Sequence, residues 1–184
     1  MTWRFLPNAL SFMRIGLVAP AVWSLHAQRY RLAIALIVLA GATDALDGLL
    51  ARRFGWSSYV GAILDPLADK LMLVSIYAAL AWLGHLPVWL AGLVVARDLG
   101  IVAGAVAFHF LIGTVRMAPT VAGKANTAVQ LSLIGVVVGH LAGLPFPAQL
   151  GEGLVWLTAA TTLWSGGDYV YTWGRRALTS RNAD

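Results

Sequence analysis

The sequence has no cysteine and few charged residues, and both features narrow the class of protein. Without cysteine, the 184 residues can form neither a disulfide nor a thiolate metal site. Only 11% of the residues are charged and 59% are hydrophobic, which lies outside the range of a soluble globular domain. Apolar runs without any charged residue extend from Leu71 to Ala96 and from Ala125 to Gly151. Each is longer than the roughly 20 residues needed to cross a bilayer, so we expect a lipid environment.

The apolar runs and the breaks between them predict an all-α, polytopic integral membrane protein. Stretches rich in Gly, Pro and Ser, such as "GHLP" and "GLPFPAQLGEG", are typical of turns between helices. We expect one membrane domain over residues 1–184, with a frayed tail from about 177 to 184. The six expected transmembrane helices cover approximately residues 6–26, 32–51, 59–83, 87–112, 120–143 and 150–173.

The positions of the basic residues predict the orientation in the membrane. The net charge of +5 comes mostly from residues at the ends of apolar runs, so it indicates membrane topology rather than a nucleic-acid partner. One side holds only Arg29 and Arg31. The side shared by both termini holds Arg4, Arg52, Arg53, Arg116, Arg175, Arg176 and Arg181. Both termini are therefore expected to be cytoplasmic.

The start of the chain favours a bacterial inner (cytoplasmic) membrane. Arg14 interrupts the first apolar stretch, which favours an uncleaved first span over a cleaved signal peptide. No Arg- and Ser-rich transit segment precedes that span.

Four carboxylates fall inside the second and third expected spans, in "DALDGLLARRFGWSSYVGAILDPLADK". Asp44 and Asp47 are three residues apart and Asp65 and Asp69 four apart, so each pair shares a helical face. At about 1.5 Å per residue, Asp44 lies roughly 12 Å in from Arg52, and Asp65 lies at a similar depth. We expect the four side chains to converge in the cytoplasmic half of the bilayer.

Such a cluster needs cations, because neighbouring buried anions repel one another and lose hydration. Oxygen-only ligands favour Mg²⁺ or Mn²⁺, and two such ions are a device for phosphoryl transfer. Arg52 and Lys70 could contact phosphate oxygens. One alternative is a structural salt-bridged cluster. Another is an ion- or proton-coupled transporter, against which stand the lack of an inverted repeat and the one-sided position of the carboxylates.

The same stretch resembles the signature of the CDP-alcohol phosphatidyltransferase family, D-x2-D-G-x2-A-R-x8-G-x3-D-x3-D, at all eight fixed positions. That resemblance implies six helices, a homodimer and two divalent cations, Mg²⁺ or Mn²⁺. It makes Asp69 both a metal ligand and the general base. The implied metal ligands are Asp44, Asp47, Asp65 and Asp69, and the implied CDP-binding residues are Gly48, Ala51, Arg52 and Gly61.

Polar residues outside this stretch are candidates for binding the acceptor alcohol: Arg14, Arg97, Lys124 and Asn126. The structural alternative is pairing of Arg14 or Arg97 with Asp98 or Asp168, and a Lys124 that reaches toward the interface. No histidine is assigned to catalysis.

Local sequences narrow the resemblance within the family. "PNALSFMRI" is common to phosphatidylglycerophosphate synthases and CMP-forming cardiolipin synthases, whereas "LVVARDLGIV" and "KANTAVQLSL" look more like the latter. The resemblance therefore implies transfer of a phosphatidyl group from CDP-diacylglycerol to phosphatidylglycerol, giving cardiolipin and CMP. Asn126 stands where glycerophosphate enzymes typically carry a lysine, which suits a phosphodiester monoanion better than the more highly charged glycerol-3-phosphate. Glycerol-3-phosphate as the acceptor remains the alternative.

Overall fold

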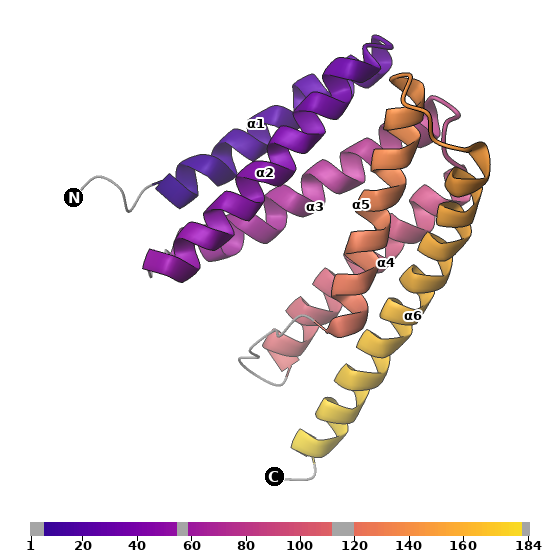
Figure 1. Ribbon diagram of the computed structural model, residues 1–184. Helices are drawn as coiled ribbons and strands as arrows, with labels where there is room; N and C mark the ends of the chain where they lie inside the picture. Colours follow the sequence, from indigo (N-terminus) through magenta and orange to yellow (C-terminus); the bar gives the residue numbers. More distant parts are fainter. Residues whose placement is uncertain (1–5, 55–58, 112–119, 182–184) are drawn as a thin grey trace. The chain divides into compact units, whose positions relative to one another are not determined.

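The computed structural model describes residues 6–54, 59–111 and 120–181, with side chains at residues 9–46, 67–104, 120–147 and 149–172. Throughout these residues the secondary structure is helical, without a strand (Figure 1). The helices are α1 Leu6–His26, α2 Tyr30–Phe54, α3 Tyr59–Trp82, α4 Val88–Leu111, α5 Val121–Leu141 and α6 Ala148–Arg181. The all-α prediction is confirmed, and the helices follow the predicted ranges to within a few residues at most ends.

The sixth helix differs most from its prediction. It continues to Arg181, past the expected end of the span at residue 173 and through the first part of the expected tail. Its last turns contain polar and basic residues, "TWGRRALTSR", which continue a helix although they do not belong to an apolar run.

Membrane association is supported by length, composition and exposure. Among the described residues, Ala9–His26 and Val121–Leu141 are long and apolar enough to cross a bilayer. Large apolar side chains also face outward: Trp82 is 84% exposed and Trp156 is 70% exposed. Extensive apolar exposure is expected for a surface that contacts lipid. Six spans and cytoplasmic termini remain predictions.

Three helices end in the same hydrogen-bonded turn. After α3, Gly84 has φ of 76°, its N–H donates to Ala81, and the N–H of His85 donates to Leu80. This is the Schellman motif, which satisfies the last carbonyls of a helix and favours glycine at the left-handed position. Gly143 has the same role after α5, and Gln28 takes it after α1 with φ of 56°. The turn signals read from the sequence thus correspond to helix ends.

The chain divides into two compact units, each described here by itself. The first comprises Met1–Val88 with Ile134–Phe146, and the second comprises Trp89–Leu133 with Pro147–Asp184. The single domain expected from the sequence remains a prediction.

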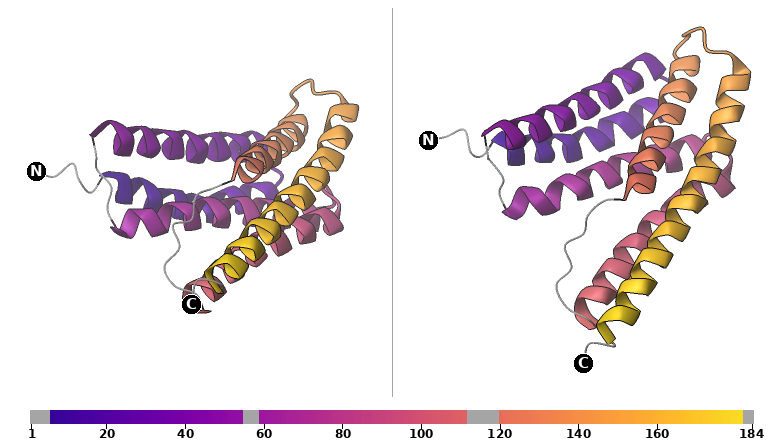
Figure 2. Two further views of the ribbon diagram at one scale, coloured as in Figure 1. Left: turned by 90° about the horizontal axis from the view of Figure 1, so that it is seen from below. Right: turned by 60° about the horizontal axis from the view of Figure 1, so that its bottom comes forward.

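In the first unit, α1 packs against both α2 and α3 (Figures 1 and 2). Its buried face contains small side chains, including Ser11, Ala21 and Ser24, each 0% exposed. Facing α2 contributes Ala33 and Ala40, which are also buried. Small residues allow helix backbones to approach closely, which is how helices associate in lipid.

In the second unit, α4 and α6 contact the first half of α5 through an unusually polar interior. Trp89 of α4 and Trp156 of α6 stack with ring centroids 5.6 Å apart near one end. Further along, six of the buried side chains are polar: Asp98, Asn126, Gln130, Thr158, Thr162 and Ser165. Polar side chains buried at this density are functional candidates in a membrane protein.

Candidate active site

Two of the four signature aspartates meet at one arginine of α1. Arg14 Nη1 lies 3.1 Å from Asp44 Oδ1 and 2.6 Å from Asp69 Oδ1. Since both oxygens approach the same nitrogen, the two carboxylates are close neighbours. The predicted convergence of α2 and α3 is therefore observed for these two residues, and α1 supplies the cation between them.

Burial differs sharply between the partners. Arg14 is 1% exposed, whereas the Asp44 and Asp69 side chains are 47% and 46% exposed. The guanidinium is thus buried, whereas about half of each carboxylate side chain is exposed. An arginine in this position offers charge-assisted hydrogen bonds to both carboxylates and limits the distance between them.

The other signature residues are placed along the helices only. Asp47 lies on α2, one turn after Asp44, and Asp65 lies on α3, one turn before Asp69. The helices assumed for the spacing argument are therefore present. The side chains of Asp47, Asp65, Gly48, Ala51, Arg52 and Gly61 lie outside the described residues.

Among the described residues, two carboxylates lie together as possible metal ligands, and no group of three or more is found. Asp44 and Asp69 offer half-exposed carboxylate oxygens close together, which is the ligand chemistry that Mg²⁺ and Mn²⁺ prefer. Together with Asp47 and Asp65 on the same two helices, they would supply an all-oxygen ligand set.

The second unit contains a buried arginine, Arg97, whose charge is neutralised by a neighbouring aspartate. Arg97 of α4 donates to Asp98 Oδ1 at 2.7 Å and to the Ser165 hydroxyl of α6. Its guanidinium lies 5.5 Å from the centroid of the Tyr169 ring. Arg97 and Asp98 side chains are each 6% exposed. The pairing of Arg97 with Asp98, weighed as the structural alternative, is observed, and it leaves this buried group without net charge.

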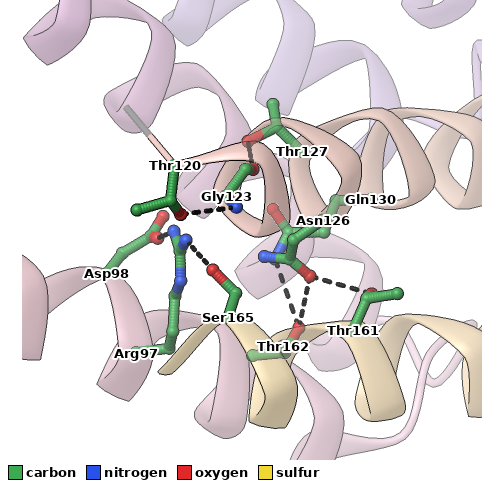
Figure 3. A network of polar contacts seen from close by, with 10 residues as sticks. All are labelled: Arg97, Asp98, Thr120, Gly123, Asn126, Thr127, Gln130, Thr161, Thr162 and Ser165. Atoms are coloured by element: carbon green, nitrogen blue, oxygen red, sulfur yellow. Dashed lines mark hydrogen bonds and ion pairs between the residues drawn. The ribbon is translucent and has the colours of Figure 1, made fainter. Parts of the chain in front are cut away.

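One helical turn away along α6, Asn126 of α5 is held by threonines (Figure 3). Its Oδ1 accepts from Thr161 Oγ1 at 3.0 Å and from Thr162 Oγ1 at 2.9 Å. Gln130 Nε2, one turn further along α5, lies 3.5 Å from Thr162 Oγ1. Asn126 is 0% exposed, so its amide is fixed inside the unit.

The four acceptor candidates thus fall into three places. Arg14 joins the aspartates in the first unit, and Arg97 and Asn126 share the polar interior of the second. Lys124 is exposed on α5 and, two residues from Asn126, lies on a different helical face.

A pocket of about 270 Å³ lies beside Arg97 in the second unit. Its lining residues are Arg97, Gly100, Ile101, Gly104, Gly166, Tyr169 and Val170. Three glycines in the walls carry no side chain, and a Cβ added at Gly100 or Gly104 would meet no atom within 4 Å. The pocket is therefore apolar along its walls and has one guanidinium beside it.

Sequence reasoning missed the α6 partners in this network. Thr162, Ser165 and Tyr169 recur at intervals of three or four residues, and Gln130 follows Asn126 by one turn. Helical spacing of hydroxyl residues within a membrane span was the signal that could have found them.

Comparison with known proteins agrees with the motif. A sequence model of the CDP-alcohol phosphatidyltransferase family matches residues 4–164. The chain therefore belongs to the CDP-alcohol phosphatidyltransferase family, a family that generally depends on a divalent metal. The predicted family is confirmed.

The relatives are named as two kinds of enzyme, which differ in the acceptor alcohol. The first kind is cardiolipin synthase. The chain is 36% identical over 181 residues to the "Cardiolipin synthase (CMP-forming) / mitochondrial hydrolase fusion protein" of Schizosaccharomyces pombe, covering 89% of this chain and 30% of that protein. It is 32% identical over 190 residues to the human cardiolipin synthase (CMP-forming), covering 94% of this chain and 62% of the relative. The chain thus spans less than two thirds of the length of both.

A bacterial relative is named instead for glycerol-3-phosphate as the acceptor. The chain is 31% identical over 174 residues to the CDP-diacylglycerol–glycerol-3-phosphate 3-phosphatidyltransferase of Pseudomonas fluorescens, covering 87% of this chain and 85% of that protein. Similar identities to both kinds of enzyme mean that similarity alone leaves the acceptor open.

Proposed function

We propose that the protein transfers a phosphatidyl group from CDP-diacylglycerol to phosphatidylglycerol, giving cardiolipin and CMP. The observation that carries the proposal is the meeting of Asp44 and Asp69, the first and last aspartates of the family signature, at Arg14. Members of this family share the CDP-alcohol substrate, and a lipid-embedded helical protein can hold both the acyl chains and the nucleotide of such a donor.

In the proposed reaction Asp69 acts as the general base. Its carboxylate takes the proton of the acceptor hydroxyl while that oxygen attacks the phosphorus bearing the diacylglycerol. The bond from this phosphorus to the bridging oxygen breaks, and CMP leaves. Arg14 orients the Asp69 carboxylate through the 2.6 Å hydrogen bond.

Two Mg²⁺ or Mn²⁺ ions, held by Asp44, Asp47, Asp65 and Asp69, would supply the charge that stabilises the diphosphate and the departing CMP. Gly48, Ala51, Arg52 and Gly61 are proposed to bind the CDP portion. The proposal also includes a homodimer in a bacterial inner membrane with the site facing the cytoplasm.

The second unit supports a lipid acceptor with a single phosphate charge. Arg97 is compensated by Asp98, and Asn126 adds a hydrogen-bond donor without charge. A more highly charged acceptor would favour a further cation. We place an acyl chain of the acceptor in the glycine-lined pocket beside Arg97, and we retain Lys124 and Arg14 as acceptor contacts.

The second candidate is transfer to glycerol-3-phosphate, which the name of the Pseudomonas relative favours. Purified protein is given CDP-diacylglycerol and Mn²⁺ or Mg²⁺, with phosphatidylglycerol and glycerol-3-phosphate in parallel, and the lipid product is identified by mass. Cardiolipin formed only from the first acceptor supports the proposal. Phosphatidylglycerophosphate formed only from the second replaces it, while ion flux into liposomes without CMP release would favour a transporter.

A further inference from the structure

A chain of hydrogen bonds with a single direction runs through the interior of the second unit. Gln130 Nε2 lies 3.5 Å from Thr162 Oγ1, which lies 2.9 Å from Asn126 Oδ1. An amide nitrogen can only donate, and a hydroxyl has one proton. Thr162 therefore accepts from Gln130 and gives its own proton to Asn126. This order directs the carboxamide oxygen of Asn126 toward α6.

Of the two threonines, Thr162 is the one whose hydroxyl proton goes to Asn126 alone within the described part of the chain. Thr161 Oγ1 also reaches Asn126, at 3.0 Å, but it lies 2.9 Å from the Leu157 carbonyl and 3.2 Å from the Thr158 carbonyl. Its single proton is shared among three acceptors. Thr162 is 1% exposed, and among the described residues its hydroxyl has one acceptor, Asn126. Loss of the Thr162 hydroxyl would thus remove the main constraint on the amide.

The NH2 end of the Asn126 amide is also buried. Asn126 is 0% exposed, and its Nδ2 has no hydrogen-bond partner among the described residues. A buried unsatisfied donor costs free energy, so its retention points to a partner that arrives with a ligand. Thr161 and Thr162 occupy the oxygen, which leaves the NH2 group as the part of Asn126 able to bind that ligand.

The guanidinium of Arg97, a residue of α4, lies one turn from Asn126 against the same face of α5. A Cβ added to Gly123, three residues before Asn126, would be 3.4 Å from Arg97 Nη2. The guanidinium therefore lies against the α5 backbone where no side chain intervenes. Because Asp98 neutralises Arg97, the guanidinium and the Asn126 NH2 group offer N–H donors without added net charge, which suits the singly charged oxygens of a phosphodiester better than a more highly charged phosphate.

We propose that Thr162 is a positioning residue that directs the Asn126 NH2 group at a phosphodiester oxygen of the acceptor. The inference rests on the proposed function, because it assigns part of the acceptor specificity of that reaction to a residue of α6. Asn126 then selects a singly charged acceptor through hydrogen-bond geometry.

The test compares two threonine variants of the full chain. Thr162→Val removes the positioning hydroxyl with little change in volume. Thr158→Val is the matched control, because Thr158 is 0% exposed, lies one turn earlier on α6 and has an Oγ1 with no partner among the described residues. Rates are measured against phosphatidylglycerol and against CDP-diacylglycerol separately, with thermal stability in detergent for each variant.

Thr162→Val is expected to raise KM for phosphatidylglycerol about tenfold, the effect of roughly one hydrogen bond, and to leave KM for CDP-diacylglycerol unchanged. Thr158→Val is expected to leave KM for phosphatidylglycerol and KM for CDP-diacylglycerol unchanged. Asn126→Asp, which exchanges the NH2 for an oxygen, is expected to lose acceptor binding more completely than Thr162→Val. The inference is overturned by an unchanged acceptor KM in Thr162→Val, or by equal changes in both KM values that parallel a loss of stability.

The wild-type assay separates failure of the inference from failure of the proposed function. Cardiolipin production by the wild type together with an unaffected Thr162→Val variant overturns only the inference. Production of phosphatidylglycerophosphate alone overturns the proposed acceptor, and with it the phosphodiester contact assigned to Asn126.

Discussion

Asp69 accepts a 2.6 Å hydrogen bond from Arg14, a residue 55 positions earlier in the chain. The same guanidinium nitrogen lies 3.1 Å from Asp44. One buried cation thus connects three helices at two of the aspartates of the family signature. Arg14 is for this reason a residue whose replacement should affect stability and activity together.

Replacement of Arg14 by Met should destabilise the first unit by about 2 kcal/mol, because two carboxylates lose their shared cation while remaining partly hydrated. Thermal unfolding in detergent with EDTA measures this. Added Mn²⁺ should raise the melting temperature of Arg14→Met more than that of the wild type, since the variant has the less compensated carboxylates. Arg29→Met, at the turn after α1, serves as the control. Equal metal responses would contradict the assignment.

Replacement of Asp69 by Asn should lower CMP release about 100-fold or more, the usual contribution of a general base. The assay contains saturating Mn²⁺ and both lipids. Asp168→Asn, a carboxylate of α6 with no assigned role, should retain activity. CMP release by Asp69→Asn at the wild-type rate would exclude Asp69 as the base.

Replacement of Gly104 by Leu fills part of the pocket beside Arg97 and should lower kcat/KM for long-chain phosphatidylglycerol about tenfold. Short-chain phosphatidylglycerol should be used nearly as well as by the wild type, because it needs less of the pocket. Gly92→Leu, on the same helix and outside the lining, controls for the added side chain. Equal losses for both lipids would show that the pocket does not hold an acyl chain.

The three Schellman turns give a paired stability test. Gln28 adopts φ of 56°, which glycine tolerates better, so Gln28→Gly should stabilise the protein by up to about 1 kcal/mol. Gly84→Ala should destabilise it by a similar amount, although a Cβ there meets no atom within 4 Å. Unfolding by titrated denaturant in detergent measures both. Changes of the same sign would contradict the turn geometry.

The helix positions were predictable because apolar runs and Gly- and Pro-containing turns mark them directly. The end of α6 was not, since its polar last turns continue a helix without belonging to an apolar run. The meeting of Asp44 and Asp69 followed from spacing and depth, but their partner Arg14 depends on how α1 is rotated against α2 and α3. Periodicity within a single helix carries no such information.

The α6 hydroxyl residues in the polar interior of the second unit were missed for a related reason, although Arg97 and Asn126 were predicted as candidates. A Ser or Thr in a membrane helix often bonds to its own backbone, as Ser132 does with the Ala128 carbonyl. The sequence alone does not separate such a residue from Thr162, which bonds to another helix.

The adjacency of Arg97 and Asp98 bears on how the protein is made. An arginine at the centre of a helix costs about 2.5–3.5 kcal/mol during insertion by the translocon. If α4 spans the membrane as the sequence predicts, it carries its own counter-ion when it leaves the ribosome, because Asp98 follows Arg97 directly, and it needs no later helix to provide one. Arg14 differs because its partners, Asp44 and Asp69, are synthesised after it. The charge of Arg14 on α1 is therefore neutralised only after α2 and α3 have been made.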